Sequence, residues 1–269
     1  MRCVNNVLGR TASSPHRTSA ELARSFGGAA EDYERGRPGW PDGAISHLTQ
    51  ELGLAPQATV LDLGAGTGKL TRALVERFEH VTAVEPLESL RRRLEAMVPE
   101  ATALGGTAER IPLPDESVDA VFVGEAFHWF DGGRALAEIA RILRGSGGVA
   151  LLWNVQEGTE PPVPPEVQEL LDRLRLEAKP ARARYGSYEW RRAFEGAPFE
   201  DLREARFAHA IKLDRDGLLA YASSQSYVAV LPEEERTAVL DELRGRIADG
   251  VYRLRFRTDA FWTRLVQAR

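Results

Sequence analysis

The sequence predicts an α/β protein whose core is a doubly wound, mostly parallel β-sheet, partly covered by a helical cap. Two observations predict this fold class. Short apolar segments alternate with amphipathic helical segments as far as residue 154, and three closely spaced glycines, in the stretch TVLDLGAGTGKLT, follow the first apolar segment. Such alternation is typical of right-handed βαβ units, in which helices join parallel strands.

Four segments are predicted to be buried parallel strands because they are apolar on both faces. They are residues 59–63, 81–86, 118–124 and 148–154. A further short strand is expected just before Ala108. Apolar residues at helical spacing predict helices between the strands, at residues 69–78, 88–97 and 131–145.

The pattern changes after Asn154. A proline-rich connector begins at Val155 and leads to an amphipathic helix near 164–178. A basic and aromatic segment (179–192), a strand (204–214), two helical segments (215–231 and 232–250) and a last strand (257–266) follow. We expect a single domain over residues 20–269, with cap elements at about 20–53, 155–200 and 214–250. Residues 1–19 lack the apolar centre of a signal peptide and are expected to form a disordered leader.

Composition excludes several classes of function. The net charge of −5 argues against nucleic acid as the main partner, because phosphate binding needs a basic surface. The single cysteine, Cys3, allows no disulfide framework and no cysteine-based metal site, and no metal is predicted. No apolar run is long enough to span a membrane, so no membrane partner is expected, and a cytoplasmic location is predicted. A monomer and a homodimer both stay possible.

The glycine run indicates a ligand that lies against bare backbone. A phosphate-binding P-loop would need a glycine at position 63 and a hydroxyl residue at position 70, but both positions are leucine. The dinucleotide-binding pattern G-x-G-x-x-G is one residue longer than the run from Gly64 to Gly68. An oxidoreductase on a variant dinucleotide fold therefore stays an alternative, with a mismatched motif.

Acidic residues at the strand ends indicate the chemistry of the ligand. The carboxylate of Asp62, at the end of the first strand, would repel a pyrophosphate but suits an ammonium group. Glu85 ends the second strand, 21 residues after Gly64, where a carboxylate can accept hydrogen bonds from ribose hydroxyls. Ala108 and Glu109 follow the third strand, from which a side chain can reach an adenine edge.

These motifs occur in a recognisable order. The segments VLDLGAGTGKLT, VEP, GTAERIPLPDESVDAVFV and EAFHWF resemble the successive motifs of class I S-adenosylmethionine-dependent methyltransferases. More narrowly, AFHWFD, YERGRPGWP, LLWN, SQSYVAVLPEEER and FRTDAFW resemble the small-molecule (type 11) branch that includes trans-aconitate methyltransferase-like proteins. The resemblance covers about residues 26–266. It implies a Rossmann-like sheet of seven strands and S-adenosyl-L-methionine as the cofactor.

The resemblance also implies which residues bind the cofactor. Those implied to lie along its methionine part are Tyr33, Arg37, Glu125 and Ala126, and Asp62 joins them on the charge argument above. Gly64, Gly66 and Gly68 are implied to admit the methionine part and the ribose close to the backbone. Those implied to hold its ribose and adenine are Glu85, Pro86, Ala108 and Glu109.

Glu125, His128 and Trp129 follow the fourth strand, where the resembling enzymes place the methyl acceptor. Their i, i+3, i+4 spacing predicts that they share one face of a helical turn. An imidazole with a pKa near ~6.5 can take a proton from an O–H or N–H group, so we predict that His128, assisted by Glu125, is the catalytic base. The alternative is that His128 and Trp129 only shape the pocket. The resembling branch commonly has a glutamine in place of Glu125.

The methyl acceptor is predicted to be a small molecule. The Trp and Tyr content of the predicted cap favours an aromatic or heteroaromatic acceptor, such as an indole or phenol of secondary metabolism. Residues predicted to contact it are Trp40, His128, Trp129, Tyr185, Tyr188, Ser226 and Tyr227, whereas Trp153 is expected in the core. Two alternatives stay open. One is a carboxyl O-methyltransferase of the trans-aconitate type, which Glu125 would disfavour by charge repulsion, and the other is a non-catalytic cofactor-binding protein.

Overall fold

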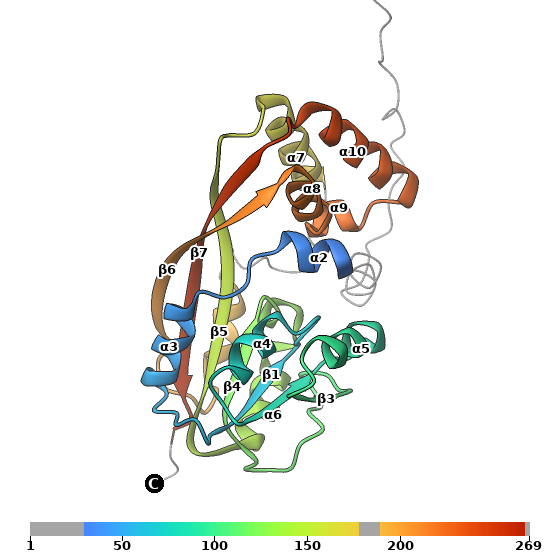
Figure 1. Cartoon of the computed structure of the whole chain (residues 1–269). Coiled ribbons are helices and arrows are strands. Elements are labelled where there is room, and N and C mark those ends of the chain that lie inside the picture. The colour runs from blue at the N-terminus through green and yellow to red at the C-terminus, as the bar shows by residue number, and fades with distance from the viewer. Residues whose placement is uncertain (1–29, 178–188, 267–269) are drawn as a thin grey trace, which may run out of the picture.

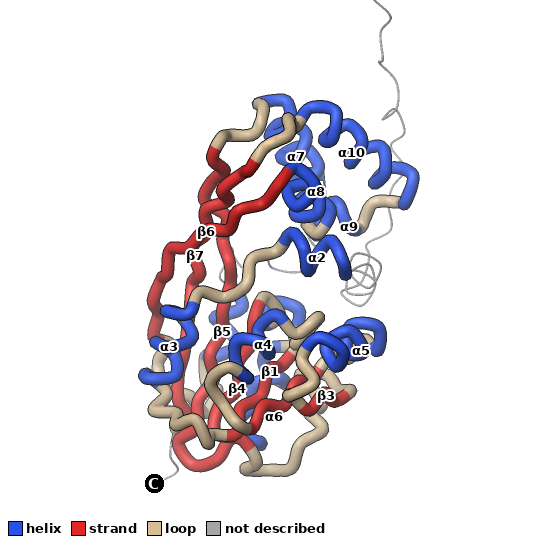
Figure 2. Tube along the Cα trace, in the orientation of Figure 1, coloured by secondary structure: helices blue, strands red, loops and turns tan. Residues whose placement is uncertain are grey.

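A computed structural model describes residues 30–177 and 189–266 of the chain (Figure 1). The predicted leader, residues 1–19, lies outside the described residues. The described chain forms a sheet-and-helix core with a group of helices at one end of the sheet (Figure 2).

Seven strands form one sheet in the order β3-β2-β1-β4-β5-β7-β6. The strands are β1 (Thr59–Leu63), β2 (His80–Val84), β3 (Thr102–Leu104), β4 (Val118–Gly124), β5 (Leu143–Glu160), β6 (Arg203–Asp214) and β7 (Val251–Arg264). Strands β1 to β5 run parallel to one another, and β7 is antiparallel to both β5 and β6. The predicted fold class, a mostly parallel and doubly wound sheet, is confirmed.

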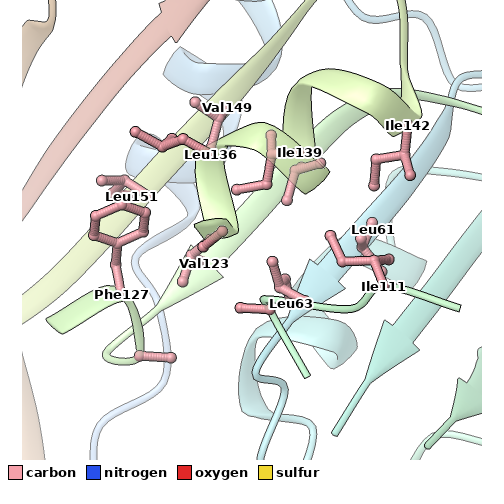
Figure 3. Packing of buried hydrophobic residues seen from close by; sticks show 14 of the residues in the cluster. Leu61, Leu63, Ile111, Val123, Phe127, Leu136, Ile139, Ile142, Val149 and Leu151 are labelled. Carbon is pink, nitrogen blue, oxygen red and sulfur yellow. The ribbon is translucent and has the colours of Figure 1, made fainter. Parts of the chain in front are cut away.

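Helices cover both faces of the parallel strands, which is why these strands are apolar on both sides. The helices beside the sheet are α3 (Asp42–Glu51), α4 (Lys69–Val75), α5 (Glu88–Met97) and α6 (Gly132–Ile142). On one face Leu136 and Ile139 of α6 pack against strand residues such as Val123 (Figure 3). On the other face Ile45 of α3 and Leu74 of α4 are fully buried.

Strands β5, β7 and β6 extend far beyond the parallel part of the sheet. They have 18, 14 and 12 residues, and β5 pairs with β7 from Gly148 to Glu160. The predicted connector from Val155 is therefore wrong for its first six residues, and the last strand begins at Val251 rather than at residue 257. The physical reason is the alternation in YRLRF, where the aromatic and aliphatic side chains are buried and the arginines between them are exposed.

A helical lobe, defined here as α7 (Pro165–Glu177), α8 (Arg215–Ser223), α9 (Ser226–Ala229) and α10 (Glu233–Arg246), covers one face of this extension. Its core includes Leu218 of α8 and Leu254 and Phe256 of β7. The short helix α2 (Ala30–Gly36) lies between this lobe and the parallel part of the sheet (Figure 1). The lobe and α2 therefore lie beyond the carboxyl ends of β1 and β4, where open α/β sheets bind their ligands.

Candidate active site

The glycine turn connects β1 to α4 and has the tight geometry that the sequence predicts. Gly64, Gly66 and Gly68 have φ angles of 74°, 59° and 89°, in the left-handed region that favours glycine. A Cβ on Gly64 would lie only 2.8 Å from the Cβ of Ala126, so the turn is packed against the residues that follow β4. A Cβ on Gly66 would meet nothing within 4 Å, so the backbone is open there.

Asp62 provides a buried carboxylate beside this turn. Its side chain is 1% exposed, and its Oδ2 accepts a hydrogen bond of 2.6 Å from the hydroxyl of Thr71. No residue in the described part of the chain bonds its Oδ1. Burial raises the pKa of Asp62 to about 7, the negative charge of Glu85 adds to the increase, and the hydrogen bonds from Thr71 oppose it. A buried oxygen without a donor is costly, and a cationic group would satisfy it.

Glu85 reaches from the end of β2 to the glycine turn. Its Oε2 accepts from the backbone N–H of Gly66, and its Oε1 accepts from that of Leu87, each at 2.9 Å. Burial raises the pKa of Glu85, whereas these two N–H groups and Arg91 lower it. Each carboxylate oxygen has a second lone pair, so the side chain can still accept hydrogen bonds from hydroxyl groups.

The residues after β3 have roles that the sequence did not predict. Ala108 is 3% exposed and belongs to the core cluster around α6. The carboxylate of Glu109 accepts a hydrogen bond of 2.8 Å from the backbone N–H of Asp131, which caps α6. Pro86 is exposed beside Glu85. Contact between these residues and an adenine stays a prediction.

Glu125 leaves β4 in a strained backbone conformation. Its φ angle is 55°, which is uncommon for a residue other than glycine. The prediction that it shares a helical face with His128 and Trp129 is wrong, because only Phe127–Trp129 form a short 3-10 turn, η2. The Glu125 Oε1 accepts from the backbone N–H of Asn154 at 2.7 Å. Desolvation raises the pKa of Glu125, while Arg37 and the Asn154 N–H lower it.

His128 lies on η2 and is bonded to strand β5. Its Nδ1 accepts a hydrogen bond of 3.2 Å from the indole N–H of Trp153. Trp153 is 1% exposed, which confirms that it belongs to the core. Burial lowers the pKa of His128 to about 4, so the imidazole is neutral near pH 7. The ring of Trp129, a half-buried residue, lies 5.0 Å from that of His128.

Helix α2 is attached both to the glycine turn and to the helical lobe. Glu34 accepts a hydrogen bond from the hydroxyl of Thr67 and lies 3.3 Å from the guanidinium of Arg72. Lys69 donates to the backbone oxygen of Glu34 at 2.9 Å. At the other end of α2, a Cβ on Gly36 would lie 2.2 Å from the backbone nitrogen of Tyr221 in α8, so only glycine fits this contact.

Arg37 connects the end of α2 with three tyrosines, which we call the tyrosine cluster: Tyr33, Tyr221 and Tyr227. Its guanidinium donates to the hydroxyl and to the backbone oxygen of Ser224, each at 2.9 Å, and lies 5.7 and 5.6 Å from the rings of Tyr33 and Tyr221. Burial raises the pKa of Tyr33 and of Tyr227 to about 12, so both hydroxyls stay protonated. Glu125 interacts electrostatically with Tyr33 and Tyr221.

Tyr221 is the site residue that sequence reasoning missed. It is 8% exposed, and its hydroxyl donates to the side-chain oxygen of Gln156 at 2.9 Å. The segment SQSY, which begins three residues further on, contains the predicted contacts Ser226 and Tyr227, but a tyrosine within an apolar helix gives no signal of its own. Only the packing of α8 against α2 identifies it.

Comparison with known proteins identifies the family. Residues 61–151 match the family model described as "Methyltransferase domain". An uncharacterized methyltransferase of Mycobacterium tuberculosis is 40% identical over 228 residues, which are 85% of this chain and 87% of the relative. The chain belongs to the S-adenosylmethionine-dependent methyltransferases. A malonyl-[acyl-carrier protein] O-methyltransferase of Methylococcus capsulatus is 36% identical over 142 residues, 47% of this chain and 48% of that protein.

A solved structure, named as that of a putative methyltransferase, shares the fold. The putative Type II methyltransferase from Anaeromyxobacter dehalogenans superposes with a TM-score of 0.59 at 27% identity, over 86% of this chain and 99% of that chain. The two chains therefore share the fold described above.

The glycine turn of this methyltransferase fits S-adenosylmethionine. The unbonded Oδ1 of Asp62 suits the ammonium of the methionine part, and the open backbone at Gly66 leaves room for the ligand. The carboxylate of Glu85, already held by the Gly66 N–H, is placed to accept ribose hydroxyls. Among residues 30–177 and 189–266, no group of three or more His, Cys, Asp or Glu side chains could hold a metal ion.

The remaining residues predicted to contact the acceptor lie in separate parts of the methyltransferase. A Cβ on Gly124 would lie 2.6 Å from the ring of Trp40, so Trp40 packs against the end of β4. Ser226 is exposed at the start of α9. Tyr185 and Tyr188 lie outside the described residues.

No helix in the described part of the chain has both the length and the apolar character needed to cross a bilayer.

Proposed function

We propose that this methyltransferase acts on a small, flat acceptor with an ionisable O–H or ring N–H group, and that Glu125 takes the proton. The observation that carries the proposal is the bonding of the Glu125 carboxylate. Oε1 is held by the Asn154 N–H, and none of the described residues bonds Oε2. Desolvation makes this carboxylate more basic than an exposed glutamate. A positioned base of this kind contributes about 10²–10⁴-fold to a rate.

The surroundings of Glu125 support an aromatic or heteroaromatic acceptor, such as a phenol or an indole. Tyr33 and Tyr221 interact electrostatically with Glu125, and the ring of Tyr227 belongs to the same cluster through Tyr221 and Arg37. Aromatic side chains favour flat ligands through offset or edge-to-face ring contacts. The strained backbone of Glu125 is itself a common feature of functional sites.

The residues of the chain have separate tasks in this mechanism. Bound S-adenosylmethionine supplies a methyl group already activated by its positive sulfur. Asp62 would hold the methionine part of the cofactor and Glu85 its ribose, and helix α2, attached through Glu34, covers the turn. Glu125 takes the proton that the acceptor loses.

A carboxyl O-methyltransferase, the type that includes trans-aconitate methyltransferases, is the second candidate. The relative named as a malonyl-[acyl-carrier protein] O-methyltransferase supports it, because that reaction methylates a carboxyl group. Against it, the Glu125 carboxylate would repel an acidic acceptor, and the guanidinium of Arg37 is already bonded to Ser224. A non-catalytic cofactor-binding role is disfavoured because neither Glu125 nor His128 has all its bonding groups satisfied within the described chain.

The test is transfer of labelled methyl from S-adenosylmethionine to phenols, indoles and carboxylic acids, by wild type and by Glu125→Gln. We expect a phenol or an indole to be methylated, and turnover by Glu125→Gln to fall about 10²-fold while cofactor affinity, measured by calorimetry, is unchanged. Glu157→Gln, an exposed residue of β5, is the matched control. Methylation of carboxylic acids alone, or full activity of Glu125→Gln, would contradict the proposal.

A further inference from the structure

The hydrogen bond between Trp153 and His128 fixes which nitrogen of the imidazole carries the proton. An indole N–H is a donor only, so the His128 Nδ1, 3.2 Å away, must offer its lone pair. In a neutral imidazole with an unprotonated Nδ1, the hydrogen is on Nε2. Burial acts to keep the ring neutral, and no charged group contributes to the shift in the pKa of His128.

Trp153 is held rigidly enough to impose this state. Its indole lies 4.7 Å from that of Trp190, at an interplanar angle of 34°, and 5.9 Å from the ring of Phe261 in an edge-on contact. All three residues are at most 6% exposed. Rotation of the indole away from His128 would therefore require a rearrangement of the core.

The Nε2 of His128 is available for a ligand at the carboxyl edge of the sheet. Within the described part of the chain, no residue bonds Nε2, and the side chain is half-buried. On either side of it, Ala126 and Phe130 contact the glycine turn, because a Cβ on Gly64 would lie 2.8 Å from the first and 3.2 Å from the second. The turn η2 thus lies next to the site of the methyl donor.

We propose that Trp153 is a positioning residue that holds His128 as its Nε2–H tautomer, so that His128 donates a hydrogen bond to the methyl acceptor. This inference rests on the proposed function, and it reverses the role predicted for His128 from the sequence. A nitrogen that already carries a hydrogen cannot take the proton of the acceptor, which goes to Glu125. The acceptor therefore carries a second group with a lone pair, such as a carbonyl oxygen or a ring nitrogen, near the atom that is methylated.

The tautomer can be measured without knowing the acceptor. Long-range ¹H–¹⁵N spectra of the imidazoles, with His128 assigned by the loss of its signals in His128→Gln, distinguish Nε2–H from Nδ1–H. We expect Nε2–H in wild type from pH 6 to 8. In Trp153→Phe the hydrogen should be shared between both nitrogens, and the titration midpoint should rise, because a bond that favours the neutral ring is lost. Trp190→Phe, which removes the indole that packs against Trp153, should leave the tautomer of His128 unchanged.

The outcomes separate the two proposals. If His128 in wild type carries its hydrogen on Nδ1, or is cationic, the inference is overturned whatever the acceptor is. This measurement needs only the wild-type protein, so it decides the tautomer even if Trp153→Phe does not fold. The donor role is tested with an acceptor found among the phenols, indoles and carboxylic acids above. His128→Gln keeps an amide N–H donor, so its kcat should stay within about tenfold of wild type. His128→Phe has no donor, so its kcat should fall roughly 10²-fold, the effect of removing a donor to a reacting group. Equal losses in both variants would contradict the donor role while leaving Glu125 as the base.

Discussion

The two halves of the sheet are built in different ways. Strands β1 to β4 have three to seven residues, and each is followed by a turn or helix that carries a cofactor-binding candidate. Strands β5, β7 and β6 have 12 to 18 residues and carry the helical lobe at their far end (Figure 1). The first half brings together residues that are close in sequence, and the second brings together residues that are far apart.

The same difference separates the proposed cofactor site from the proposed acceptor site. Around the glycine turn, Asp62 and Thr71 are 9 positions apart, and Gly66 and Glu85 are 19 apart. Around the tyrosine cluster, the bonded residues Arg37 and Ser224 are 187 positions apart, and Tyr221 and its partner Gln156 are 65 apart. The proposed cofactor site is therefore encoded locally, whereas the proposed acceptor site depends on the tertiary fold.

The largest expected effect is that of Asp62→Asn in the locally encoded half. The variant keeps an oxygen for the Thr71 hydroxyl but loses the charge that faces the cofactor ammonium. A charge-assisted hydrogen bond contributes about 1.5–3 kcal/mol, so we expect the affinity for S-adenosylmethionine, measured by calorimetry, to fall roughly 10²-fold. Asp119→Asn, which removes a carboxylate of β4 bonded to the Thr59 N–H, is the control and should bind normally. Unchanged affinity of Asp62→Asn would exclude Asp62 from the site.

The pH dependence has a definite sign. Because burial raises the pKa of Asp62 from 3.8 to about 7, its contribution favours the folded state below pH 3.8 and is lost as the pH rises to 7. Above pH 7 Asp62→Asn should therefore unfold at a higher temperature than wild type, although it binds the cofactor less tightly. Cofactor affinity of wild type should fall below pH 7, where the carboxyl group is protonated. A melting temperature lower than that of wild type at pH 8 would show that the carboxylate is not destabilising.

How well the sequence predicts the site residues in each half of the sheet follows from this difference. The glycine spacing, Asp62 and Glu85 could be found from the sequence because a tight turn and strand-end carboxylates need particular residue types at short spacing. The hydrogen bonds of the Glu125 carboxylate and of the His128 imidazole could not, because their partners, Asn154 and Trp153, belong to another strand. The length of β5 was hidden by the glycine and polar residues of QEGTE, whose pairing depends on β7.

A smaller effect is expected from Arg37→Ala, which separates α2 from the helical lobe. Two hydrogen bonds from a charged donor to Ser224 and two ring contacts are lost. We expect the free energy of unfolding in urea to fall by about 2 kcal/mol, while cofactor affinity falls less than in Asp62→Asn. Arg35→Ala, two residues away, removes only an exposed ion pair with Asp214 and should change stability little. Similar losses in the two variants would mean that the lobe is not held through Arg37.

The smallest effect concerns two single tyrosine hydroxyls, Tyr221 in the helical lobe and Tyr252 on strand β7, which the lobe covers. Tyr221→Phe removes a hydrogen bond of 2.9 Å to Gln156, and Tyr252→Phe removes one of 3.0 Å to the backbone oxygen of Ala248. Both side chains are at most 8% exposed, so each variant should lose about 1 kcal/mol of stability. Only Tyr221 belongs to the tyrosine cluster, so only Tyr221→Phe should raise the KM for the acceptor, by about threefold to tenfold. If both variants raise KM equally, the change comes from loosening of the lobe, and the tyrosine cluster is not the wall of the acceptor site.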